Sequence, residues 1–94
     1  MANDLAYLLA MHSDPAIRDP SRAVELAQSA CRATGYRRPE LLDTLAVSYQ
    51  AHGRREEAIQ TLLKAMDASE TSGNVELLAL LRRRMETFQQ TPAE

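Results

Sequence analysis

A pair of apolar stripes in residues 42–65 constrains the fold more than any other feature of the chain. Leu42, Leu45 and Tyr49 recur at spacings of three and four, so a helix would place them in one continuous stripe. The second stripe has the reverse spacing and consists of Ala58, Leu62 and Ala65. Gly53 stands between the stripes, where a helix end favours a residue in the left-handed conformation. The segment therefore predicts an antiparallel helical hairpin.

Two alanines of this hairpin occupy positions that require a small side chain. Ala46 and Ala58 lie where the two helices would come closest, and a larger residue would push the helix axes apart. Together with the stripes, they have the spacing of the tetratricopeptide repeat, in which a large residue, Leu, a small residue and Tyr precede Ala-x3-aromatic. The chain therefore resembles tetratricopeptide repeat (TPR) proteins over residues 3–89, most strongly over 39–70. Its leading half is similar to a variant found in long bacterial arrays.

A second hairpin of the same kind precedes the first along the chain. Ala23 lies 35 residues before Ala58, close to the period of about 34 residues in the family. Leu5 lies 40 residues before Leu45, so the first hairpin carries an insertion of five residues in its turn, residues 12–20. That turn holds two Asp-Pro pairs, each typical of a carboxylate N-cap followed by proline at the first helical position.

The C-terminal segment predicts half a repeat. After Gly73, one amphipathic helix over 74–89 has no partner helix, so it would cover the last apolar surface of the stack and turn its polar face to solvent. Its expected buried face consists of Leu77, Leu81, Met85 and Phe88. The other helices are predicted over 3–12, 20–34, 39–52 and 55–71.

The predicted architecture is a single all-α domain over residues 1–94. The resemblance implies antiparallel helix hairpins stacked as a TPR-type right-handed solenoid of five helices, or about two and a half repeats. The first repeat covers about 3–36 with an elongated turn at 12–20, the second covers about 39–72, and the capping helix covers about 74–89.

The resemblance also implies a binding surface. In the family, the first helix of each repeat lines a concave face that binds an extended peptide or a partner helix. By register, the residues expected on that face are Asn3, Tyr7, Met11, Asp43, Val47, Gln50, Arg82 and Met85. Methionines suit an apolar or helical ligand. Tyr7 and Asp43 stand where a carboxylate clamp would need polar or basic groups, so we expect no clamp of that type on this face.

Charge and hydropathy exclude several function classes. Thirteen acidic residues against eleven basic ones leave no positive footprint for nucleic acid. Three successive arginines, Arg82 to Arg84, would span about 200° of a helix and cannot all meet one ligand. No apolar run reaches the length of a membrane helix, and no signal-peptide pattern is present. We therefore expect no nucleic acid or membrane partner and a cytoplasmic location.

Chemistry-bearing motifs are also lacking in the sequence. Cys31 is the single cysteine, which rules out an internal disulfide. His12 and His52 stand near the C-termini of predicted helices, where a histidine ordinarily caps the last carbonyls, and no cluster has metal-ligand spacing. No nucleophile elbow or glycine-rich phosphate loop occurs. The sequence therefore predicts no enzyme, no cofactor and no metal site.

Two functions remain open at the level of sequence. The first is a non-catalytic scaffold for protein–protein interaction, whose concave face binds a peptide or a partner helix. The second is self-association into a homo-oligomer. The predicted first helix is short, and Ala2 occupies a slot where the family prefers a large aromatic residue, so the start of the stack would stay open to a second copy. The same feature would fit the C-terminal part of a longer TPR array.

Overall fold

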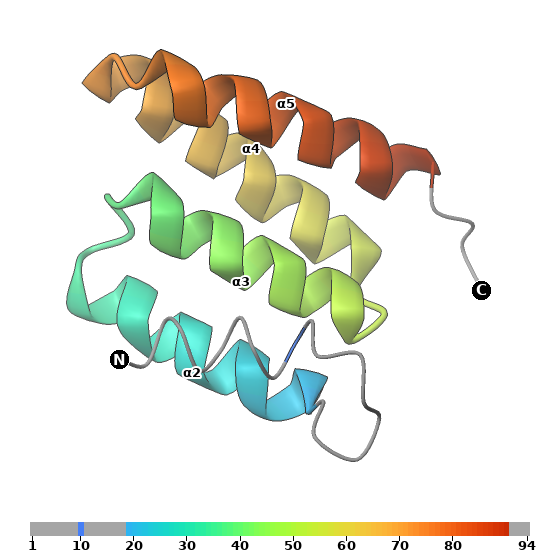
Figure 1. The fold of residues 1–94 in the computed structure, drawn as a ribbon. Helices are drawn as coiled ribbons and strands as arrows, with labels where there is room; N and C mark the ends of the chain where they lie inside the picture. Colours follow the sequence, from blue (N-terminus) through green and yellow to red (C-terminus); the bar gives the residue numbers. More distant parts are fainter. Residues whose placement is uncertain (1–9, 11–18, 91–94) are drawn as a thin grey trace.

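The computed structural model describes Ala10 and residues 19–90, where the regular secondary structure is all α-helix and no strand occurs (Figure 1). The helices that follow one another are α2 (Pro20–Ala33), α3 (Pro39–Ala51), α4 (Arg55–Ser72) and α5 (Val75–Gln90). Each begins and ends within one residue of its predicted range, so the all-α class and these helices are confirmed. Apart from Ala10, which is helical, the helix predicted over 3–12 lies outside the described residues, as does most of the elongated turn.

Side chains fix the starts of α2 and α5. Asp19 Oδ1 accepts a hydrogen bond from the backbone N–H of Arg22 at 3.2 Å, and Pro20 occupies the first helical position, as predicted. Asn74 caps α5 in the same way, because its Oδ1 accepts a hydrogen bond from the backbone N–H of Leu77 at 3.2 Å. Local sequence alone therefore sets where these two helices begin.

The ends of α2, α3 and α4 share one geometry. A glycine with φ between 66° and 77° follows the last turn of each helix, a conformation that residues with a Cβ rarely adopt. The next residue donates its backbone N–H to the carbonyl five residues earlier, at 2.8–2.9 Å. These glycines are Gly35, Gly53 and Gly73. The motif satisfies carbonyls that the helix end leaves open and turns the chain back on itself.

Each of these helices packs against its neighbours in the chain, and α3 also contacts α5. Figure 1 shows the resulting order, with α3 between α2 and α4 and with α5 at the far end. Four alanines of α2, α3 and α4 have no exposed surface: Ala23, Ala46, Ala58 and Ala65. Ala46 and Ala58 are therefore interior, as their expected position between the two helices requires.

The core is distributed unevenly among the helices. Leu42, Leu62 and Leu81 are fully buried, one each from α3, α4 and α5. α3 buries nine of its thirteen residues, whereas α5 buries only two of sixteen. On α5, Leu81 and Phe88 are buried as predicted, while the other two residues of the predicted stripe are half-buried. α3 is thus a central helix, and α5 covers the core with one face only.

Candidate functional site

Five of the eight residues predicted for the concave face lie in the described part of the chain, on α3 and α5. Val47 is only 2% exposed and Asp43 only 8%, so neither presents its side chain to solvent. Gln50 and Met85 are half-buried, and Arg82 is exposed. The remaining three, which lie outside the described residues, are Asn3, Tyr7 and Met11. The accessible part of this surface is therefore carried by Gln50, Arg82 and Met85.

An ion pair that sequence reasoning missed joins α3 to α5. Arg84 Nη2 donates a hydrogen bond to Asp43 Oδ2 at 3.1 Å, and Arg84 Nε lies 2.5 Å from Oδ1 as a charge contact. The two side chains are only 18% and 11% exposed. Burial raises the pKa of the Asp43 carboxyl, and the charge and hydrogen bond of Arg84 oppose that rise. The pair thus holds two charges in the interior between two helices.

The sequence did contain a signal for this pair. Arg84 lies 35 residues after Tyr49, in a slot that the preceding unit fills with a core tyrosine. A charged residue in a core slot needs a partner, because an unpaired charge is costly to bury. Asp43 was expected to face a ligand, but its position on the central helix makes it that partner.

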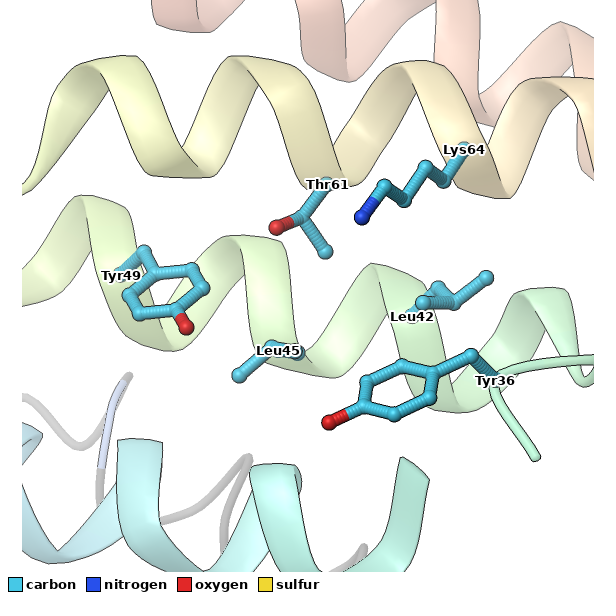
Figure 2. Close-up of a pocket in the computed structure, with 6 residues that line it drawn as sticks. All are labelled: Tyr36, Leu42, Leu45, Tyr49, Thr61 and Lys64. Carbon is cyan, nitrogen blue, oxygen red and sulfur yellow. The ribbon is translucent and has the colours of Figure 1, made fainter. Parts of the chain in front are cut away.

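A small pocket lies on the side of α3 that faces away from the Asp43–Arg84 pair (Figure 2). Its volume is about 200 Å³. The residues that line it are Tyr36, Leu42, Leu45, Tyr49, Thr61 and Lys64. The turn after α2 supplies the first, α3 the next three, and α4 the last two. The spacing of one helix stripe does not reveal such a site, because three separate elements form its wall.

Two contacts hold the Tyr49 ring at the edge of this pocket. Its hydroxyl accepts a hydrogen bond from Gln28 Nε2 on α2 at 2.8 Å. The Arg54 guanidinium lies over its ring, 4.7 Å from the centroid, in a cation–π contact. Arg54 is in turn paired with Glu57, and the hydrogen bond from Arg54 lowers the pKa of the Glu57 carboxyl. The aromatic wall of the pocket is therefore fixed from both sides.

Among the described residues, neither the cysteine thiol nor the potential metal ligands form a further candidate site. Cys31 is fully buried, and burial raises the pKa of its thiol to about 11, so it stays a protonated core residue. Within residues 19–90 and Ala10, no group of three His, Cys, Asp or Glu side chains is placed to hold a metal ion. Among the same residues, no helix is long and apolar enough to cross a membrane.

Comparison of the chain with protein-family models, with curated proteins and with solved structures finds no match in any of the three. The likeness to TPR proteins therefore depends on the residues of this chain, above all on the stripes and alanines of α3 and α4.

Proposed function

We propose that the chain is a non-catalytic, TPR-type scaffold for protein–protein interaction, which holds a peptide or a partner helix on the face of α3 and α5. The helix predicted over 3–12 would extend this face and complete a right-handed solenoid of five helices. We also propose that the chain belongs to a TPR array of bacterial type and that it acts in the cytoplasm. The observation that carries it is the regular packing in chain order, in which the same glycine-ended joint follows α2, α3 and α4.

The accessible residues of this face are chemically suited to a peptide. Arg82 supplies an exposed cation, and Met85 supplies a flexible apolar side chain beside the core. Gln50 Oε1 is buried and has no hydrogen-bond partner among the described residues. Because an unsatisfied buried acceptor is costly, rotation of the Gln50 amide toward a ligand N–H would gain a hydrogen bond at little loss of hydration.

Selection of binders from a random peptide library tests this proposal, with Arg82→Glu as the face variant. Arg83→Glu is the matched control, because it makes the same charge change at an exposed neighbour about 100° further around α5. Peptides selected on the unmodified chain are expected to bind Arg82→Glu at least about tenfold more weakly, a loss typical of one charged contact. Fluorescence anisotropy with labelled peptides measures the Kd. Equal weakening by both variants would show general charge attraction and contradict the assignment of the face.

A second candidate function, self-association, is supported by exposed apolar residues on α4 and α5. Leu63, Val75 and Leu80 are 53%, 75% and 46% exposed, and they lie on two helices that contact each other. On this reading, the molar mass measured by light scattering rises above that of one chain with increasing concentration, and Leu80→Glu abolishes the rise. Gln89→Glu is the control, because position 89 lies about 180° around α5 from Leu80. A constant monomer mass at all concentrations excludes self-association.

A further inference from the structure

The pocket beside Tyr49 combines an apolar base with polar walls. Leu42 and Leu45 are buried and form its base on α3. Figure 2 shows the hydroxyls of Tyr36 and Tyr49 on either side of Leu45, while Thr61 and Lys64 descend from α4. The volume of about 200 Å³ is below the range of pockets for drug-sized ligands, so it suits one small group or one side chain.

Hydrogen-bond donors predominate among the polar groups of this pocket. Tyr49 already accepts a hydrogen bond from Gln28, so its own hydroxyl proton remains free to be donated. Thr61 is almost buried, and its hydroxyl makes no hydrogen bond to another described residue. No carboxylate lines the pocket. The group that matches these walls is an acceptor with two oxygens.

Lys64 gives the pocket its charge. It is the single lysine of the chain, since ten of the eleven basic residues are arginines. Among the described residues no carboxylate pairs with it, whereas Arg54 and Arg84 both have acidic partners. An ammonium group is a compact point charge with three donors, which suits a single anionic group. No arginine in the described part of the chain lines the pocket, and a single cation favours a monoanion over a phosphate.

The backbone of the turn after α2 holds the rim of the pocket in place. Tyr36 has φ 57°, in the left-handed region that disfavours a residue with a Cβ. Its N–H donates to the Cys31 carbonyl at 2.8 Å, and the N–H of Gly35 donates to Arg32, so the helix end fixes this conformation. A strained backbone that positions a ring at a pocket rim reduces the ordering needed when a ligand binds.

We propose that this pocket binds a carboxylate on a short apolar stem, with Lys64 and the hydroxyl of Thr61, which lie side by side below α4 in Figure 2, contacting the carboxylate and Leu42 and Leu45 contacting the stem. The site lies about 130° around α3 from Val47 and Gln50. It is therefore separate from the face of α3 and α5, and its test does not depend on whether the proposed function is correct.

Titration with butanoate, followed by NMR of backbone amides and of the single lysine side chain, tests the proposal. Butanamide is the neutral ligand of the same shape. Saturable shifts are expected at Leu45, Thr61 and Lys64 with butanoate, at a Kd on the order of 1 mM for so small a ligand, and butanamide should produce none. Equal shifts with both ligands, or shifts that do not saturate, would overturn the proposal.

Variants separate the pocket from general charge attraction. Lys64→Met is expected to weaken butanoate binding at least about tenfold, because it removes the charged contact. Arg83→Gln removes one exposed positive charge on α5 and should leave the Kd unchanged. Thr61→Val, which keeps the shape of the wall, should weaken binding by a smaller factor. Unchanged binding by Lys64→Met contradicts the assignment, whatever the other variants do.

Three probes identify the source of the carboxylate. Butanoate represents a free acid, a blocked glutamate amide represents an acidic side chain, and an acetylated dipeptide ending in a free leucine carboxylate represents a chain terminus. The probe with the lowest Kd identifies the source of the carboxylate. Failure of all three to bind overturns the site.

Discussion

Replacing Asp43 with asparagine is expected to lower the free energy of unfolding by about 3 kcal/mol. The amide has nearly the same size as the carboxylate, so the change removes charge and leaves the packing intact. The Arg84 guanidinium, only 18% exposed, would then lie between α3 and α5 without a counterion. Urea denaturation followed by far-UV circular dichroism measures the loss. Such a loss would be a large fraction of the 5–15 kcal/mol typical of small domains.

Two variants separate the buried charge from other effects. In Asp43→Leu/Arg84→Met, both charges are replaced by apolar groups, and most of the lost stability should return because no charge remains to be buried. Glu57→Gln breaks the exposed ion pair with Arg54 and should have a much smaller effect than Asp43→Asn. If Asp43→Asn is no more harmful than Glu57→Gln, the Asp43–Arg84 pair does not hold α5 to α3.

Leu62→Ala is expected to reduce the free energy of unfolding by about 3 kcal/mol, whereas Leu63→Ala should change it by less than about 0.5 kcal/mol. The two leucines are adjacent on α4 and chemically identical. Leu62 has no exposed surface, and Leu63 is 53% exposed. Truncating Leu62 therefore leaves a cavity in the centre of the core, while truncating Leu63 leaves none.

The same denaturation experiment measures both leucine variants, so their difference does not depend on the reference state of the unfolded chain. The loss for Leu62→Ala should appear as a lower urea midpoint with an unchanged slope. Equal losses at the two positions would mean that α4 is rotated from the orientation described above. That result would also remove the wall formed by Thr61 and Lys64.

The helices and their joints were predictable because local signals specify them. Asp19 with Pro20 marks the start of α2, and Gly53 and Gly73 mark ends that require a left-handed residue. These signals act over a few residues and need no knowledge of the fold. The stripes on α3 and α4 were equally clear, since spacings of three and four identify one side of a helix.

The exposure of the α3 face was predicted less well. A stripe shows which residues share a side of a helix, but it does not show how many other helices surround that helix. Because α3 contacts α2, α4 and α5, its buried arc extends to Asp43 and Val47, which register alone placed on a binding surface. The pocket escaped sequence reasoning for a related reason, since Tyr36, Leu45 and Lys64 meet only after three elements have packed.

The difference between a central α3 and a covering α5 has a consequence for how the molecule opens. Releasing α5 uncovers few apolar side chains, because only Leu81 and Phe88 of that helix are fully interior. It also separates Asp43 from Arg84, but water then solvates both charges and recovers part of the lost attraction. Local fluctuations should therefore begin at α5 and leave the α3–α4 hairpin closed. Amide protons of α5 are expected to exchange with solvent long before those of α3, which hydrogen exchange followed by NMR would measure.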